Sequence, residues 1–331
     1  MKLNLYTSGE DGYHTYRIPS LIAARNGDLL AICEGRRHTA RDHGDIDLLI
    51  KRSADGGESW SEQDVIYGEP GDVTIGNPCP VLDRDTGVIW LPFCRDNRDV
   101  LMTRSEDDGK TWSPPVDISQ SASRPDWDWY ATGPGVGIQM RDHRFSGRLV
   151  IPCDHRNDNE YRNGSHALLS DDHGETWRVS ELMTPGPNEC QVVELAGGRL
   201  MMNIRMQSHR EGYRGVSLSK DGGESWTDVR HEQQLPCPRC QAGFVTDGKV
   251  LLFTNPVPPS GPAVEKGDRL NLIARISTDD GDTWSNTADL HPGPAAYSSP
   301  LILNDQEAAC FYEAGDSHFR EHLVFHRFPL R

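Results

Sequence analysis

The chain has 331 residues, of which 36% are apolar, and a formal net charge of −16 at pH 7. A chain of this length and apolar content can bury a large core, which separates it from disordered proteins. Nucleic acid and anionic membranes are poor candidate partners, because both are bound through a basic face.

The beginning of the chain, residues 1–20, lacks the apolar segment that is typical of a secretory leader. No stretch of the sequence approaches the roughly 18 apolar residues that a membrane span requires. We therefore expect a protein without a membrane span that stays in the cytoplasm.

Short strand-like segments, such as 47–52 and 270–276, recur along the chain and lead into one repeated turn. The turn has the pattern Ser-x-Asp-x-Gly-x-(Ser/Thr)-Trp. Its Asp can accept hydrogen bonds from turn amides, its Gly supplies a positive φ, and its Trp can pack on a neighbouring sheet. We therefore assign the motif a structural role as a hairpin turn. Its five copies are Ser53–Trp60, Ser105–Trp112, Ser170–Trp177, Ser219–Trp226 and Ser277–Trp284.

The spacing of the copies predicts the architecture. The first copy begins at residue 53 and the fifth at residue 277, so that a repeat averages about 56 residues and about six repeats fit into the chain. A repeat of this length with strand patterns alone is typical of a four-stranded propeller blade. We predict an all-β, six-bladed β-propeller that forms a single domain over residues 1–331. An N-terminal strand near 2–6 is expected to join C-terminal strands around 309–312 and 323–328, which removes an exposed edge.

The eight cysteines mostly lie in apolar, strand-like stretches, which is typical of buried free thiols. Cys237-Pro238-Arg239-Cys240 has the spacing of half a zinc ribbon, but no second pair follows at a suitable distance. We expect neither a metal ion nor another cofactor.

The tetrapeptide Tyr16-Arg17-Ile18-Pro19, followed by the five turn repeats, resembles the sialidases. The resemblance covers essentially the whole chain, and it implies that Arg17 is the first of three arginines that bind the carboxylate of a substrate. The segment Glu34-Gly35-Arg36 resembles the one that holds a further sugar-contacting arginine, which is Arg36 here.

The segment Asp42-His43-Gly44-Asp45-Ile46 resembles the family's loop with the acid/base aspartate. This resemblance points to Asp42. Asp45 and Asp47 are rival carboxylates, because the length of this loop varies by one residue.

The second half of the chain resembles the family in five further segments. Pro187–Gln191 resembles the segment with the paired glutamate, Glu189, and Asn203–Arg205 the one with the second clamp arginine, Arg205. The third clamp arginine is implied at Arg269, with Arg275 as the alternative. The closing segments imply Tyr297 and Glu313.

The chemistry of sialic acid explains these residue types. Its anomeric carbon carries a carboxylate, for which the planar guanidinium groups of Arg17, Arg205 and Arg269 are matched donors. Glu313 would orient Arg17 and offset the excess positive charge. A carboxylate nucleophile would repel the substrate, and sialidases use a tyrosine instead.

The resemblance therefore implies that Tyr297 is the nucleophile, that Glu189 is its base, and that Asp42 protonates the leaving oxygen. The expected function is a retaining exo-α-sialidase acting on sialylated oligosaccharides, glycoproteins or glycolipids through a covalent tyrosyl intermediate. Trp127, Trp129, Asn77 and Asp96 lie in segments that could line the pocket.

Three alternatives stay open. A glycosidase for a related ulosonic acid such as KDN would share the clamp and the nucleophile, and in a transferase another sugar would replace water. A non-catalytic Asp-box propeller that binds glycans is the alternative from another class. Such a protein would have no reason to keep Tyr297, Glu189 and Asp42 together with the arginines.

Overall fold

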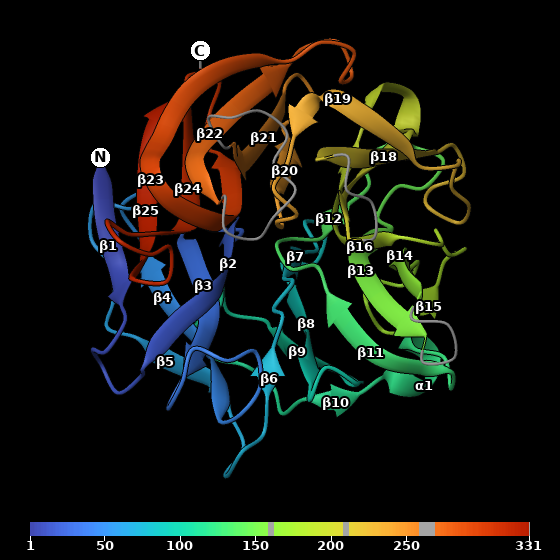
Figure 1. Ribbon diagram of the computed structural model, residues 1–331. Coiled ribbons are helices and arrows are strands. Elements are labelled where there is room, and N and C mark those ends of the chain that lie inside the picture. The colour runs from blue at the N-terminus through green and yellow to red at the C-terminus, as the bar shows by residue number, and fades with distance from the viewer. Residues whose placement is uncertain (158–161, 208–211, 258–268, 331) are drawn as a thin grey trace.

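The computed structural model describes residues 1–157, 162–207, 212–257 and 269–330 of the chain (Figure 1). Over these ranges the fold is all-β, with one short helix, α1 (Ser119–Ala122), and one 3₁₀ turn, η1 (Ala196–Gly198). Among the described residues no helix has the length and hydropathy needed to cross a membrane.

The strands form antiparallel sheets that follow one another along the chain and are arranged around a common centre, as in a β-propeller (Figure 1). The first sheet has the order β2-β3-β4-β5. Its strands are β2 (Thr15–Ala23), β3 (Leu29–Arg36), β4 (Ile46–Ser53) and β5 (Asp64–Tyr67).

The next two sheets have five strands each among the described residues. The first of them has the order β10-β9-β8-β6, with β7 also paired to β8, and the second has the order β11-β13-β14-β15, with β12 also paired to β13. Their bounds are β6 (Ile75–Gly76), β7 (Val81–Leu82), β8 (Ile89–Arg95), β9 (Asp99–Ser105), β10 (Val116–Asp117), β11 (Trp127–Thr132), β12 (Ile138–Gln139), β13 (Leu149–Asn157), β14 (Arg162–Ser170) and β15 (Arg178–Val179).

A four-stranded sheet of order β16-β17-β18-β19 comes next, and a seven-stranded sheet of order β1-β25-β24-β23-β22-β21-β20 completes the ring. Their bounds are β16 (Pro187–Glu194), β17 (Leu200–Met206), β18 (Tyr213–Ser219), β19 (Arg230–Pro236), β20 (Gly243–Thr246), β21 (Leu251–Pro256), β22 (Leu270–Ser277), β23 (Ser285–Ile302), β24 (Glu307–Ala314), β25 (His322–Pro329) and β1 (Lys2–Thr7).

The seven-stranded sheet contains the junction of the two chain ends. Its strand β1 pairs with β25, with Lys2 opposite His326 and Leu3 opposite Phe325. This confirms the expected pairing of the N-terminal strand with the C-terminal strands. The 18-residue strand β23 pairs with β22 through residues 285–294 and with β24 through residues 295–302.

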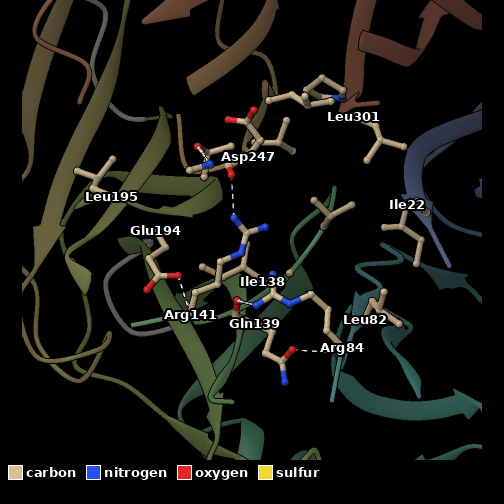
Figure 2. A pocket seen from close by; sticks show the side chains of 18 of the residues that line it. Ile22, Leu82, Arg84, Ile138, Gln139, Arg141, Glu194, Leu195, Asp247 and Leu301 are labelled. Atoms are coloured by element: carbon tan, nitrogen blue, oxygen red, sulfur yellow. Dashed lines mark hydrogen bonds between the residues drawn. The ribbon is translucent and has the colours of Figure 1, made fainter. Parts of the chain in front are cut away.

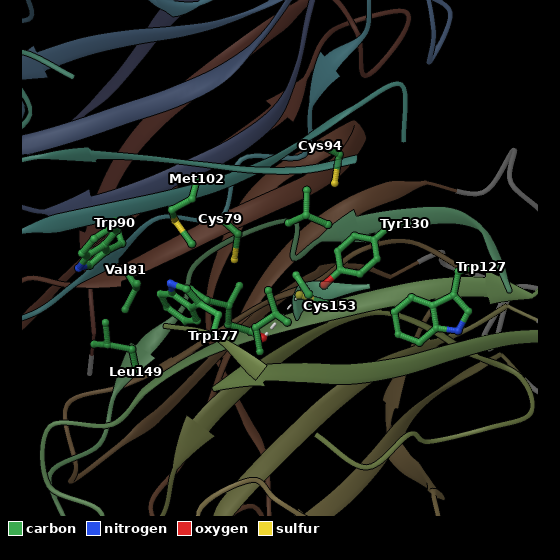
Figure 3. Close-up of a cluster of buried hydrophobic side chains, with 14 residues drawn as sticks. Cys79, Val81, Trp90, Cys94, Met102, Trp127, Tyr130, Leu149, Cys153 and Trp177 are labelled. Carbon is green, nitrogen blue, oxygen red and sulfur yellow. Dashed lines mark hydrogen bonds between the residues drawn. The ribbon is translucent and has the colours of Figure 1, made fainter. Parts of the chain in front are cut away.

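The core lies between neighbouring sheets. In the cluster of Figure 3, Trp90 of β8 and Met102 of β9 gather with Leu149 and Cys153 of β13 and with Trp177. A similar cluster joins β2 and β3 to β24 and β25, which closes the ring. Because a sheet in such a ring is covered on both faces, β3 is buried over all eight of its residues.

The repeated turns have the structural role that the sequence predicted. Asp55 accepts hydrogen bonds from the hydroxyl of Ser53 at 2.7 Å and from the amide of Ser59 at 2.9 Å. Gly57 has φ = 94° and lies against Phe325 of the adjacent sheet, where a Cβ atom would come within 2.3 Å of the ring. The ring of Trp60 packs on the same Phe325, with the two centroids 5.0 Å apart. Each turn of this kind therefore fastens one sheet to the next.

Buried polar side chains connect the innermost strands near the centre of the ring. The amide of Gln241 donates to the carbonyl of Pro134 at 3.2 Å and to that of Ser298 at 3.0 Å. The hydroxyl of Ser299 accepts a hydrogen bond from the amide of Leu21 at 3.0 Å. These bonds fix β2 and β23 in place relative to each other and to the other inner strands, and both strands carry residues of the site described next.

All eight cysteines lie within the described ranges, and all are buried and free. This confirms the expectation of buried thiols, including Cys237 and Cys240.

Candidate functional site

A cavity of about 780 Å³ opens at one end of the innermost strands. Seven of the eight site residues predicted from the sequence line it, and the eighth, Glu313, lies directly behind Arg17. The seven come from β2, β3, β16, β17, β23 and two loops, and they are Arg17, Arg36, Asp42, Glu189, Arg205, Arg269 and Tyr297.

Arg17 is held by a buried carboxylate. Its Nε donates to Glu313 Oε1 at 2.8 Å and its Nη2 to Glu313 Oε2 at 3.1 Å. Glu313 also accepts from the amides of Ile18, at 3.1 Å, and Tyr297, at 3.3 Å. Burial opposes the charge on Arg17, but Glu313, Tyr297 and Asp42 together outweigh this effect and raise the pKa of the guanidinium. A two-pronged pair of this kind fixes the position of the arginine as well as its charge.

Arg205, Glu189 and Tyr297 form a second buried group. Arg205 Nη1 donates to Glu189 Oε2 at 2.6 Å and to the hydroxyl of Tyr297 at 3.2 Å. The hydroxyl of Tyr297 donates in turn to Glu189 Oε1. Since β16 and β17 are antiparallel neighbours, Glu189 and Arg205 start from adjacent strands, whereas Tyr297 reaches them from β23.

Arg269 completes the set of guanidinium groups around Tyr297. Its Cζ lies 5.5 Å from the centroid of the tyrosine ring, and that of Arg17 lies 4.9 Å from it. Arg269 Nη2 donates to the carbonyl of Arg239 at 3.0 Å. The rival, Arg275, does not line the cavity and donates to Asn255 at 2.8 Å.

Three arginines thus meet around one phenol. Glu313 pairs with Arg17 and Glu189 with Arg205, and Asp42 also pairs with Arg17 at the rim. Apart from Asp42, the group has three guanidinium groups against two carboxylates, in a protein whose net charge is −16. Such an arrangement attracts a small anion.

The phenol of Tyr297 does not ionise on its own. Burial first, and then the charge of Glu189, raise its pKa well above the usual value, whereas Arg205, Arg269 and Arg17 act in the opposite direction. Because the hydroxyl already donates to Glu189, the proton can pass to that carboxylate when the oxygen attacks an electrophile.

Asp42 lies at the rim of the cavity, with 75% of its side chain exposed. Its Oδ1 accepts from Arg36 at 2.7 Å and from Arg17 at 3.2 Å. Partial loss of hydration in the mouth of the cavity raises the pKa of this carboxyl, but the charges of Arg36 and Arg17 and the hydrogen bond from Arg36 together outweigh this effect and lower the pKa to about 2. Arg36 is itself fixed by Glu34, which accepts from its Nε and Nη2 at 3.0 and 2.7 Å.

The rival carboxylates of this loop lie elsewhere. Asp45 pairs with Arg37 at 3.4 Å, and Asp47 is buried, where it accepts from Tyr13 and from Arg37 at 2.6 Å each. Neither lines the cavity.

Of the four further pocket candidates, Asn77, Asp96 and Trp129 line the cavity, whereas Trp127 does not. Trp127 is a core residue, and its ring stacks on that of His155 with the centroids 4.0 Å apart.

The sequence did not reveal Asp154, a fully buried carboxyl of β13 beneath Glu189. Its Oδ2 accepts from Asn188 at 2.7 Å, and its Oδ1 has no hydrogen-bond partner among the described residues. Burial and the nearby charge of Glu189 raise the pKa of Asp154 well above its usual value. Asp154 directly follows the apolar run 149–153, and only the packing of one sheet against another brings it to the site.

Glu34 is a second site residue that was not predicted from the sequence, although its spacing from Arg36 could have revealed it. It precedes Arg36 by two positions on one strand, and side chains two apart in a strand share a face.

The described residues include one group of side chains with the spacing of a metal site, Asp83, Asp85 and His173, whose ligand atoms lie within 4.8 Å of one another. Asp83 Oδ1 already accepts from Gln139 at 2.7 Å, and Asp83 Oδ2 contacts His173 at 2.9 Å. These bonds satisfy the buried carboxylate without an ion, and the group lies outside the cavity.

A second cavity, of about 560 Å³, lies at the opposite end of the same inner strands (Figure 2). On β2, Arg17 lines the first cavity and Ile22 the second. On β16, Glu189 lines the first cavity and Glu194 the second. The walls of the second cavity are largely apolar, and Arg84 and Arg141 are the cationic side chains that line it (Figure 2). Among the described residues that line it, no nucleophile is paired with a base, so the first cavity is the candidate active site.

The fold and the site together define an all-β propeller with an arginine-lined cavity at one end of its inner strands. The family model described as a BNR repeat-like domain matches residues 27–311, and the chain belongs to this family.

Sialidases are among its relatives. The sialidase of Micromonospora viridifaciens is 32% identical, over 94% of this chain and 52% of its own length. The sialidase of Bacteroides fragilis is 28% identical, over 96% of this chain and 63% of its own length. This chain therefore spans between half and two thirds of these two relatives.

A solved structure of a Hadza microbial sialidase matches with a TM-score of 0.89 and 28% identity, over 100% of this chain and 68% of that one. The resemblance to the sialidases that the motifs predicted is confirmed by these matches.

Proposed function

We propose that this chain is a retaining exo-α-sialidase that removes a terminal sialic acid from an oligosaccharide, a glycoprotein or a glycolipid. One observation carries the proposal: Arg17, Arg205 and Arg269 meet around Tyr297, whose hydroxyl donates to Glu189. Three guanidinium groups are matched to the carboxylate on the anomeric carbon of sialic acid, and they place that carbon next to the phenol.

The first chemical step breaks the glycosidic bond. The oxygen of Tyr297 bonds to the anomeric carbon, its proton passes to Glu189, and Asp42 gives a proton to the leaving oxygen. A neutral nucleophile suits this substrate, because an ionised Asp or Glu would be repelled by the substrate carboxylate.

In the second step water replaces the tyrosine. Asp42 takes a proton from the water, which bonds to the anomeric carbon, and the departing phenolate takes its proton back from Glu189. Two displacements at one carbon give net retention.

Asp42 must hold a proton in the first step, although its pKa in the free site is about 2. Arg17 contributes to this low pKa, and Arg17 is also one of the three groups proposed to bind the substrate carboxylate. A bound carboxylate would draw Arg17 away from Asp42 and add a negative charge nearby. Both changes raise the pKa of Asp42 and favour the acid form.

We also propose that the ring has six blades in a single domain, residues 1–331. In this interpretation the seven-stranded sheet is two blades that share β23, which pairs with β22 through its first part and with β24 through its last.

The test is hydrolysis of an α-sialoside with an uncharged aryl leaving group by the chain and by two variants. We expect Tyr297→Phe and Asp42→Asn each to lower kcat/KM by about a thousandfold or more. Circular dichroism and thermal unfolding should show folded proteins in both cases. Wild-type rates in both variants would exclude the mechanism, and a wild-type chain that cleaves no sialoside would exclude the function.

A further inference from the structure

A third space, distinct from both cavities described above, is a hollow of about 560 Å³ beside Asp42 at the rim of the candidate active site. Two loops form it, the one between β3 and β4 and the one between β24 and β25. Asp42, His43 and Arg320 line both this hollow and the central cavity, so the two spaces adjoin. The complete lining is Thr39, Ala40, Arg41, Asp42, His43 and Arg320.

The loop that carries Arg320 is held in place by its own hydrogen bonds. The carboxylate of Glu321 accepts from the amides of Asp316, Ser317 and His318 at 2.9, 3.0 and 2.9 Å. The hydroxyl of Ser8 donates to the carbonyl of Arg320 at 2.6 Å, which ties the loop to the N-terminal segment. A loop fixed at both its turn and its base presents its side chains at defined positions.

Phe319 connects this loop to the carboxylate clamp, which is the set of Arg17, Arg205 and Arg269. The Cζ atoms of Arg17, Arg269 and Arg320 lie 5.7, 5.6 and 5.3 Å from the centroid of its ring. Arg320 is therefore placed next to the clamp but outside it, on the side of Asp42.

The hollow is cationic. Within the described residues neither Arg41 nor Arg320 has a carboxylate oxygen within 4.0 Å, and the one acid in the lining, Asp42, is already shared by Arg36 and Arg17. Arg41 also lines the next hollow along the rim, together with Asp45 and Asp72, and Asp45 is paired there with Arg37. Asp42 and Glu313 attract Arg320 only from beyond ion-pair distance. Two guanidinium groups that form no ion pair among the described residues, in a protein of net charge −16, are suited to an anionic ligand.

We propose that this hollow is the subsite for the leaving group and that it selects sialosides whose leaving sugar carries an acidic group. The inference rests on the proposed function, because it takes Asp42 as the acid that reaches the glycosidic oxygen. If the clamp holds the sialic acid on one side of that oxygen, the leaving sugar extends past Asp42 toward Arg41 and Arg320. Guanidinium groups bind a carboxylate or a sulfate through paired N–H donors.

The experiment compares kcat/KM on three substrates. Sialyl-lactose has a neutral leaving sugar and is called the neutral substrate; the same compound sulfated on the galactose and an α2,8-linked disialoside have acidic leaving groups and are called the acidic substrates. We expect the wild-type chain to prefer the acidic substrates, and Arg320→Gln to lower the acidic-to-neutral ratio by about five- to tenfold. Added salt should lower the ratio in the wild-type chain. Arg320→Lys keeps the charge and should retain part of the preference.

A matched control is Arg25→Gln, which removes one exposed arginine beyond the far end of β2, where Arg25 donates to the carbonyl of Thr86 at 3.3 Å. This change should leave the ratio as it is. If Arg320→Gln lowers the ratio for both acidic substrates, the subsite recognises the charge of the leaving group. If it lowers the ratio for only one of them, the subsite also recognises the particular sugar or the sulfate.

Equal ratios in the wild-type and Arg320→Gln chains, with the neutral substrate still cleaved, would overturn the subsite and leave the proposed function standing. Failure of the wild-type chain to cleave any of the three would instead overturn the proposed function.

Discussion

The repeated turns and the central site both depend on carboxylates that accept several hydrogen bonds, but the donors come from very different distances along the chain. In the first turn, Asp55 is served by Ser53 and Ser59, within four positions. In the site, Glu313 accepts from Arg17 and Ile18, almost the whole chain away, and from the amide of Tyr297. A carboxylate that accepts several hydrogen bonds thus stabilises a local turn in one region, whereas in the other its donors come together only when the whole ring has folded.

Solvent exposure differs between the two regions as well. The turn carboxylates lie at the surface, where water shares the task of stabilising their charge, whereas Glu313 is 0% exposed. Loss of a partner should therefore cost little in a turn and much in the site.

The largest expected effect is the loss of the cation beside Glu313. Arg17→Met leaves a buried carboxylate without its charged partner, and we expect it to lower the free energy of unfolding by about 3–5 kcal/mol. Urea denaturation measures this change.

A second substitution separates stability from function. Adding Glu313→Gln removes the orphaned charge, so that the double variant should recover most of the lost stability while remaining inactive on an aryl sialoside. An Arg17→Met variant as stable as the wild-type chain would show that losing a partner costs no more at a buried carboxylate than at an exposed one.

A smaller effect is expected at a turn. Asp55→Ala removes the acceptor of the amide and hydroxyl of Ser59, and it should cost about 1–2 kcal/mol of unfolding free energy. Because the turn lies outside the cavity, kcat/KM should change by less than about twofold. The control is Glu58→Ala, an exposed acid of the same turn. A large loss of activity in Asp55→Ala with an unchanged unfolding midpoint would show that the two regions are not separable.

The smallest effect concerns acid pH. Hydrogen bonds from Thr111 lower the pKa of Asp107 to about 2, against about 3.9 in an unfolded chain. Between these values the unfolded state binds more protons, so this carboxylate's contribution to stability, present above about pH 3.9, is lost as the pH falls through about 2.

Asp107→Asn keeps an acceptor oxygen but cannot titrate. Its free energy of unfolding should therefore fall less steeply than that of the wild-type chain between about pH 4 and pH 2. Parallel slopes for the two proteins in urea titrations would show that the turn carboxylates do not titrate as their hydrogen bonds indicate.

The sequence by itself determined what is local or periodic in this protein. The turn motif contains its own donors and acceptors, so its role could be inferred without coordinates, and its spacing predicted a ring of strands. The order of the arginine, glutamate and tyrosine segments carried the resemblance to the sialidases, which the comparisons confirmed.

Only the tertiary structure decided which of several similar side chains meet. Asp42 and not Asp45 or Asp47 reaches Arg17, and Arg269 but not Arg275 lines the cavity. Asp154 and Arg320 carried no motif at all. The physical reason is that a side chain two positions away on a strand has the same orientation, whereas contacts across the centre depend on how separate sheets pack, which no short segment encodes.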